Sequence, residues 1–336
     1  MAISELGPWQ NGSATATATA PQATVTVTAL SGGFFTIPEE QFVHPCKQGA
    51  RATVPSLCFL IKHVCQSTNI TTHILFDLGL RRDLNRYSEP IRRHTETRQP
   101  ITTAPDVVQN LAQAGLAPDD IDYVIYSHVH WDHVGEPRDF GTGTFVVGNG
   151  SLALLQGNTS SLRGGHSFFE DDLVDLKRTI ELSNIEDTSF IKSTTNGHTI
   201  SKPDFTQPWK PLGHLQATLD IFHDGSLYIV DAPGHLPGHI NLLARTDIID
   251  ANGNYRWMYL AGDACHDRRI LRDEKAIGEW EDAHGATCCI HANRPAAEET
   301  IKRIRLLEQH GVEVVLAHDA EWVNDKCNRS RYLGGP

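Results

Sequence analysis

The stretch YSHVHWDHVG, residues 126–135, concentrates three histidines and an aspartate within six positions. His128 and His130 are two residues apart, so on an extended segment that leaves a strand their rings project to the same side. Asp132 and His133 follow where the chain must turn. Imidazole nitrogens and carboxylate oxygens are ligands that zinc prefers, and catalytic zinc sites keep a position open for water. The spacing therefore predicts a metal site rather than an exposed polar loop.

Further candidate ligands occur in three other segments, each after an apolar run that is typical of a strand. Carboxyl ends of neighbouring strands can meet at one edge of a sheet, so these side chains are expected to join the first stretch. The candidates are His235 and His239 after SLYIVDA, Asp263 after RWMYLAG, and His318 after VEVVLA.

The overall charge and the cysteines exclude several classes of protein. Acidic residues outnumber basic ones by 41 to 29, and the net charge of −12 disfavours nucleic acid as a partner. The seven cysteines form no C-x-x-C pair, which argues against a disulfide framework and a zinc finger. Because no secretory signal and no run long enough for a bilayer are found, we expect a cytoplasmic protein without a membrane partner. Both a monomer and a homodimer stay open.

Strands and helices alternate in a way that predicts an α/β fold. A helix is expected within TAPDVVQNLAQAGLAP, with Thr103 as its cap, and another from Pro295 to Gly311. The pattern suggests two sheets sandwiched by helices in one domain. The predicted strands are TVTVTAL, SLCFLIKHV, THILFDLGL, DYVIY, GTFVVGN, HLQATLDIF, SLYIVDA, INLLART, RWMYLAG and VEVVLA.

Two regions depart from this alternation. Residues 1–22 are rich in Ala, Thr, Gly and Ser and are predicted to be a disordered tail, so the folded domain would span 23–336. Residues from about 157 to 212 are polar and irregular, and an insertion of that length often serves as a substrate loop. Its aromatic residues, together with the tryptophan of the first stretch, could contact substrate or simply pack. They are Trp131, Phe168, Phe169 and Trp209.

The motifs ILFDLG, HVHWDH, APGHLPGH, AGD and AHD together resemble those of the metallo-β-lactamase-fold hydrolases. Within that superfamily the chain looks most like the N-acyl-homoserine-lactone lactonase branch, in a fungal-type lactonase or lactamase form. The resemblance covers most of the chain. It implies an αββα sandwich, with two mixed β-sheets flanked by helices, and a site for two metal ions.

The resemblance also implies roles for the matching residues. Asp263 would bridge the two metals, Asp77 of the DLG turn would support the ligands, and His239 would be a supporting or packing residue. Zinc is the expected metal at both positions, and the same donors accept iron, manganese or cobalt. One metal would be held by His128, His130 and His235, and the other by Asp132, His133 and His318.

Such a site implies hydrolysis of a carbonyl compound by metal-activated hydroxide. Asp132 or Asp263 could pass a proton to the leaving group. The lactonases that the chain resembles carry a tyrosine three residues after the bridging aspartate, where this chain has His266. His266 could stabilise the developing oxyanion or protonate a leaving nitrogen, or the substitution could be without consequence. The change opens lactams and cyclic carbamates such as benzoxazolinone as substrates beside lactones.

Other functions are also compatible with the sequence. An acyl-homoserine-lactone lactonase is the first, and a thioesterase of the glyoxalase II type is the second, although only eighteen residues follow His318. A non-catalytic scaffold would be expected to have lost ligands, whereas all seven candidate ligands are present. Other histidines, among them His94 and His291, are expected at the surface or in the core.

Overall fold

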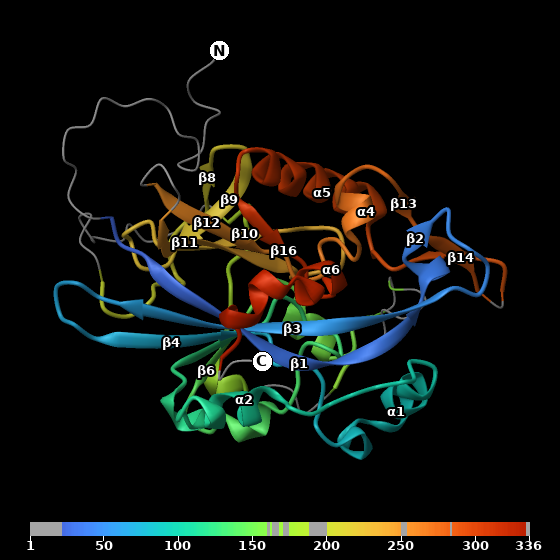
Figure 1. The fold of residues 1–336 in the computed structure, drawn as a ribbon, viewed down its shortest axis with the longest axis horizontal. Coiled ribbons are helices and arrows are strands. Elements are labelled where there is room, and N and C mark those ends of the chain that lie inside the picture. Colours follow the sequence, from blue (N-terminus) through green and yellow to red (C-terminus); the bar gives the residue numbers. More distant parts are fainter. Residues whose placement is uncertain are drawn as a thin grey trace, which may run out of the picture.

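The computed structural model describes residues 22–159, 162, 168–170, 175–187, 200–249, 254–282 and 284–333. Two mixed β-sheets lie in layers, and helices cover their outer faces, which confirms the predicted αββα sandwich (Figure 1). The two sheets are joined at one edge, where Val25 pairs in parallel with Thr246. We call them the N-terminal sheet and the C-terminal sheet.

The N-terminal sheet has the strand order β7-β6-β5-β4-β3-β1. Strands β1, β3 and β4 are antiparallel, whereas β4 to β7 run parallel to one another. The predicted runs TVTVTAL and SLCFLIKHV correspond to β1 and β3, whereas THILFDLGL forms β4 only as far as Phe76 and continues as a loop from Asp77. The bounds are β1 Val25–Pro38, β3 Arg51–Val64, β4 Thr71–Phe76, β5 Tyr123–Ile125, β6 Thr144–Val147 and β7 Thr179–Glu181.

The C-terminal sheet contains β8, β9, β10, β11, β12 and β16 in that order, and all pairs are antiparallel except β12 with β16. Two small pairs, β2 with β13 and β14 with β15, lie outside the sandwich. The bounds are β8 Lys210–Leu212, β9 Leu215–Asp220, β10 Leu227–Asp231, β11 Ile240–Ile249, β12 Tyr255–Leu260, β16 Glu313–Val315, β2 Val43–His44, β13 Ala276–Ile277, β14 Glu279–Glu281 and β15 Thr287–Cys289.

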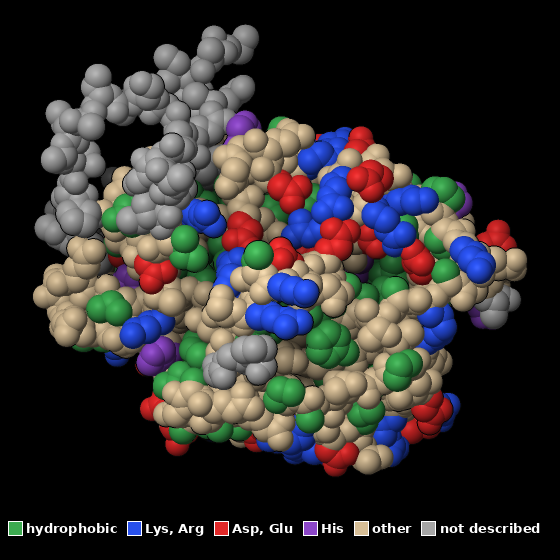
Figure 2. Space-filling model, in the orientation of Figure 1, with side chains coloured by type: hydrophobic (Ala, Val, Ile, Leu, Met, Phe, Trp, Pro, Cys, Tyr) green, Lys and Arg blue, Asp and Glu red, His purple; other side chains and the backbone are tan. Residues whose placement is uncertain are grey.

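Helices α4 and α5 lie over the C-terminal sheet, and α1 and α2 lie beneath the N-terminal sheet (Figure 1). On α5, basic and acidic side chains are interspersed, as Figure 2 shows, with Arg294 paired to Glu298 and Lys302 to Glu299. Such exposed pairs add little stability. The bounds are α1 Glu89–Glu96, α2 Val107–Gln113, α3 Ser151–Leu155, α4 Arg268–Leu271, α5 Arg294–Gln309 and α6 Ala320–Asn324.

Strand β3 is an example of a strand that is buried on both faces. Phe59 and Ile61 belong to the core between the sheets, while Cys58 and Leu60 belong to the core beneath the N-terminal sheet. Successive side chains of a strand point to opposite faces, so a strand covered on both sides reads as a continuous apolar run. This burial holds the carboxyl ends of the strands, and the loops after them, in fixed positions.

The cap of α2 differs from the prediction. Asp106 caps the helix, because its Oδ1 accepts a hydrogen bond from Gln109 N at 2.8 Å and Gln109 Oε1 accepts one from Asp106 N. This reciprocal pair satisfies two backbone donors at the helix start. Thr103 instead donates its hydroxyl to the carbonyl oxygen of Arg82.

The predicted tail, residues 1–22, lies outside the described residues apart from its last position. The described parts of the 157–212 insertion add β7 and β8, which lie at opposite ends of the strand path. The substrate-loop role of the insertion stays a prediction. Among the helices that the structure describes, none combines the length and hydropathy that a bilayer crossing requires.

Candidate metal centre

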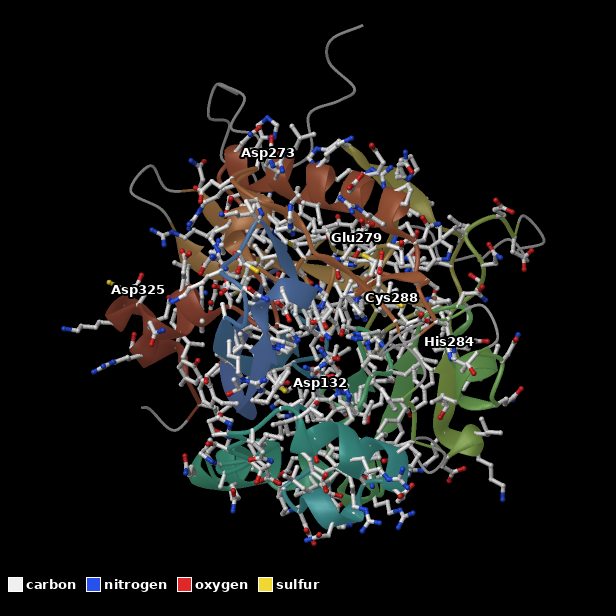
Figure 3. The ribbon with its side chains drawn as sticks, turned by 90° about the vertical axis from the view of Figure 1, so that its right-hand side faces the viewer. Asp132, Asp273, Glu279, His284, Cys288 and Asp325 are labelled. Atoms are coloured by element: carbon white, nitrogen blue, oxygen red, sulfur yellow. The ribbon has the colours of Figure 1, made fainter. Side chains whose placement is uncertain are left out.

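The predicted metal ligands lie in loops that follow β5, β10, β12 and β16. Figure 3 shows Asp132 near the middle of the molecule. None of the seven predicted ligands is more than 6% exposed. Burial of so many polar side chains in one place requires partners for them. The structure divides the seven into two groups that share Asp263.

The first group consists of His128, His130, His235 and Asp263. His130 Nδ1 lies 2.9 Å from His128 Nε2 and 3.0 Å from His235 Nε2. Asp263 Oδ2 lies 3.5 Å from His235 Nε2. Burial lowers the pKa of His128 and of His235, which favours the neutral imidazole that binds a metal.

The second group consists of Asp132, His133, Asp263 and His318. Asp263 Oδ1 lies 3.3 Å from His133 Nε2 and 3.1 Å from His318 Nε2. His318 Nε2 also lies 3.5 Å from Asp132 Oδ2. In each group, imidazole nitrogens and carboxylate oxygens therefore lie close together, and Asp263 belongs to both groups.

The donor atoms of these groups fit divalent metal ions. Within each group they lie within 4.8 Å of one another, as ligands of one ion at about 2.0–2.2 Å must. His133 Nε2 and Asp263 Oδ1 are buried 3.3 Å apart, and neither makes a hydrogen bond of good geometry within the described part of the chain. Buried polar atoms without such a bond are rare in folded proteins, and a bound ion can take the place of the absent partner. The chemistry of the donor set and its burial thus both suit a metal.

Hydrogen bonds outside the two groups fix the orientation of the imidazoles. Asp77, after β4, accepts from the backbone N and the hydroxyl of Ser127 at 2.7 Å each, and its Oδ2 lies 2.8 Å from His133 Nδ1. His318 Nδ1 donates to the carbonyl oxygen of Pro55 at 2.7 Å. In His133 and His318, Nε2 therefore faces Asp263. Such contacts set the tautomer and direction of metal-binding histidines.

His239 lies beside the site and supports the loop that carries Asp263. Its Nε2 accepts a hydrogen bond from the backbone N of Asp263 at 3.1 Å. His239 does not belong to either group of donors. Its position is compatible with the supporting role that the resemblance implies.

The pKa values of the two carboxyl groups are shifted in opposite directions. Burial raises the pKa of Asp132. Burial also opposes ionisation of Asp263, but the charges of His318 and His133 outweigh it and hold the pKa of Asp263 well below its usual range. Asp263 is thus the better-stabilised anion of the site.

His266 lies against the shared carboxylate, with its Nε2 3.1 Å from Asp263 Oδ2. It also joins His235 and His291 in a third buried group of potential ligands. Phe42 packs on the imidazole of His266 with ring centres 5.2 Å apart. His291 is buried as the sequence suggests, but it lies next to the site rather than in a remote core.

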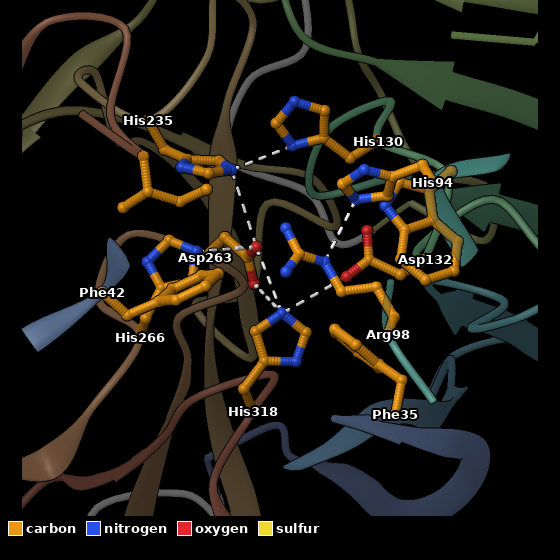
Figure 4. Close-up of a pocket in the computed structure, with 12 residues that line it drawn as sticks. Phe35, Phe42, His94, Arg98, His130, Asp132, His235, Asp263, His266 and His318 are labelled. Atoms are coloured by element: carbon orange, nitrogen blue, oxygen red, sulfur yellow. Dashed lines mark hydrogen bonds and ion pairs between the residues drawn. The ribbon is translucent and has the colours of Figure 1, made fainter. Parts of the chain in front are cut away.

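A cavity, here called the site cavity, opens onto these groups (Figure 4). Phe35, Trp131, His94 and Arg98 line it. The sequence predicts neither His94 nor Arg98 at the site; His94 lies in the last turn of α1, and Arg98 lies two residues beyond the end of that helix. His94 was expected at the surface or in the core, and it instead contacts the site cavity.

The predicted aromatic contacts divide into two classes. Trp131 and Phe168 contact the site or its surroundings, and Phe169 stacks on His130 with ring centres 5.7 Å apart. Trp209 donates to the carbonyl oxygen of Ser183 and packs against the core between the sheets. Trp209 is therefore a packing residue.

The chain is similar in sequence to a protein family and to several known proteins. A family model described as the metallo-beta-lactamase superfamily matches residues 52–141. The chain is 29% identical over 321 residues to "Cytochrome P450 monooxygenase mpaDE" of Penicillium brevicompactum, across 89% of this chain and 34% of that protein. It is 28% identical over 251 residues to "Gamma-lactamase FDB1" of Fusarium pseudograminearum, across 73% of this chain and 54% of that protein.

Among solved structures, an N-acyl homoserine lactone hydrolase with the product N-hexanoyl-L-homoserine at its catalytic metal center has a similar fold. The TM-score is 0.60 at 16% identity, over 90% of this chain and 95% of that one. The chain spans only 34% of the length of the P450-named relative. It therefore matches one part of that protein.

Proposed function

We propose that the chain is a member of the metallo-beta-lactamase superfamily, whose family model matches residues 52–141, and that it is a metal-dependent hydrolase that opens a cyclic ester or a cyclic amide. In this reaction water adds to the carbonyl carbon and the ring C–O or C–N bond breaks. A lactone or lactam then carries a new carboxylate together with a hydroxyl or amino group, whereas a cyclic carbamate gives a carbamate that loses CO₂ and leaves both a hydroxyl and an amino group.

The position of Asp263 is the observation that carries the proposal. Its Oδ1 faces His133 Nε2 at 3.3 Å and His318 Nε2 at 3.1 Å. Its Oδ2 faces His128 Nε2 at 3.8 Å and His235 Nε2 at 3.5 Å. A carboxylate between two sets of imidazoles suits a bridge between two ions. This supports two metals per chain, with zinc as the proposed metal.

Bound divalent ions would acidify a water molecule and polarise the substrate carbonyl. The remaining steps fall to the side chains. His266 lies within hydrogen-bonding distance of Asp263, so it can donate a proton to a group that reacts beside that carboxylate. Asp132, whose pKa burial raises, is placed to carry a proton toward the leaving group.

The aromatic lining of the site cavity favours a flat ring as substrate. Phe35 and Trp131 meet edge to face with ring centres 5.3 Å apart, and both line the cavity. An aromatic lactam, lactone or cyclic carbamate such as benzoxazolinone matches such walls. The name of the gamma-lactamase relative supports a lactam among these substrates.

A panel of substrates tests the proposal. Metal-replete protein would be analysed for zinc, iron, manganese and cobalt, then assayed with benzoxazolinone, phthalide, N-hexanoyl-homoserine lactone and a glutathione thioester. We expect about two metals per chain and ring opening of an aromatic substrate. Preference for the homoserine lactone would favour the quorum-quenching alternative, and preference for the thioester would favour the glyoxalase II type. No bound metal after a metal-replete preparation would contradict the dinuclear site.

A further inference from the structure

A second cavity, here called the outer cavity, lies next to the site cavity. Its walls include Arg51, Phe168 and Trp280. The two cavities share His94, Arg98 and Ile290. A molecule that reaches the candidate metal centre through the outer cavity must therefore pass Arg98.

The outer cavity is positively charged, although the chain as a whole carries a net charge of −12. Two arginines, Arg51 and Arg98, line it, and none of its lining residues in the described ranges is acidic. Arg51 donates to backbone carbonyl oxygens, among them Thr97 O at 2.8 Å. Within the part of the chain that the structure describes, neither guanidinium has a carboxylate within 4.0 Å. This local excess of positive charge favours an anionic ligand.

Arg98 is held rigidly with one nitrogen turned to the cavity. Its Nε donates to His94 Nε2 and its Nη2 to Gln41 Oε1, both at 3.2 Å. Its carbonyl oxygen accepts from Thr36 N at 2.8 Å, which ties this residue to β1. Nη1 makes no hydrogen bond to any described residue, and Figure 4 shows the guanidinium pointing into the site cavity.

The guanidinium is charged in this environment. The side chain is only 9% exposed, and burial lowers its pKa to about 10, which still leaves it protonated at neutral pH. The charge of Asp132 acts in the opposite direction and raises the pKa of Arg98, but the two side chains form no ion pair within 4.0 Å. Asp132 instead lies 3.5 Å from His318 Nε2, on the metal-centre side. The positive charge of Arg98 is thus left for a ligand.

Aromatic rings line the two cavities that share Arg98. His94 lies 4.7 Å from Phe168 and 5.6 Å from Trp131, measured between ring centres. Trp280 lies on β14, in the small pair of strands β14 and β15, and lines the outer cavity. Walls of this kind accept flat rings, whereas Nη1 offers a charged donor to an oxygen at the ring edge.

We propose that the substrate is a flat aromatic lactone or lactam that carries a carboxylate substituent, and that Arg98 binds this carboxylate. The inference rests on the proposed ring-opening function and adds the charge of the substrate to it. Arg98 then determines specificity and does not take part in the bond changes. Arg51 strengthens the attraction from the outer cavity.

Binding and turnover test the proposal separately. Affinities of metal-replete protein for 2-naphthoate and its neutral analogue 2-naphthamide would be measured by calorimetry. We expect naphthoate to bind at least tenfold more tightly, and Arg98→Met to remove this difference while leaving naphthamide affinity unchanged. Arg98→Lys should keep part of the preference. Arg93→Met is the matched control, because Arg93 lies on α1 with its side chain 72% exposed, and it should bind like wild type.

Turnover would be compared for phthalide-5-carboxylate and its methyl ester. The wild type should show a kcat/KM at least tenfold higher for the carboxylate, and Arg98→Met should lose that ratio through KM. Equal affinity of the wild type for naphthoate and naphthamide, or an equal loss of both in Arg98→Met, would overturn the role of Arg98. Naphthoate preference without hydrolysis of either phthalide would contradict the hydrolase function and leave anion recognition by Arg98 standing.

Discussion

His266 Nε2 lies 3.1 Å from Oδ2 of Asp263, the carboxylate shared by both groups of metal-binding side chains. The two residues are three positions apart in the loop after β12. In the lactonases that the chain resembles, a tyrosine occupies the position of His266. The contact therefore brings an imidazole to a place where those enzymes have a phenol.

Replacement of His266 by alanine tests whether this imidazole takes part in the reaction. We expect kcat to fall more than tenfold, because a positioned proton donor typically contributes a hundredfold or more to rate. Metal content should stay that of the wild type, since the seven proposed ligands are intact. Steady-state kinetics and elemental analysis of the same preparation measure both. Wild-type turnover in His266→Ala would exclude a catalytic role.

Alanine at the two carboxylates should affect metal content to different degrees. Asp263→Ala removes the group that faces both sets of imidazoles, so it should lose most of both metals. Asp132→Ala removes a ligand of the second group only and should retain about one metal per chain. Elemental analysis after dialysis against metal-free buffer would show this, with the exposed Asp119→Ala as a control. Equal metal content in all three variants would contradict the assigned ligands.

Removal of the metals should lower thermal stability as well as activity. A ligand present at a hundredfold excess over its Kd stabilises the native state by about 2.7 kcal/mol. Chelation should therefore lower Tm by several degrees in a chain of this size. Calorimetry before and after chelation, and after zinc is restored, measures the effect. A Tm that does not respond to chelation would show that these buried side chains need no ion.

Asp77 should influence metal affinity without contacting a metal. It accepts from Ser127 and lies 2.8 Å from His133 Nδ1, so it fixes the direction of the His133 ring. Asp77→Ala should weaken metal binding about ten- to a hundredfold, as is typical when such a support is removed. Competition with a chromophoric chelator gives the affinity. Circular dichroism must remain native, because Asp77 also adopts a positive φ of 62° that alanine tolerates poorly.

Much of this architecture follows from local patterns in the sequence. Continuous apolar runs predict strands, and a polar cluster directly after such a run predicts a group at the end of a strand. His128, Asp263 and His318 could be placed together on that basis, because the sheet brings strand ends to a common edge. The cap of α2 was misassigned, since both Thr103 and Asp106 are acceptable cap residues and only the pairing with Gln109 decides between them.

The walls of the cavity could not be predicted in the same way. Arg98 follows a short helix, and Trp280 lies on a two-stranded pair outside the sandwich. No periodicity in the sequence tells how such elements pack over a sheet edge. For Trp209 the sequence left substrate contact and packing both open, and the structure shows that it packs against the core between the sheets.

Asp231, the last residue of β10, should make stability depend on pH. Burial raises its pKa to about 6, against a smaller opposing effect of Arg303. The folded state then binds the proton more tightly than the unfolded state, whose pKa is about 3.9. The stabilisation is complete below about pH 4 and is lost as the pH rises through 6.

Asp231→Asn keeps a neutral side chain at every pH, so it should be more stable than the wild type at pH 8, by about 3 kcal/mol at most. Urea unfolding of both proteins at pH 5, 6 and 8, with zinc held constant, measures this difference. A gap between the two that does not widen with pH would show that Asp231 is ionised throughout.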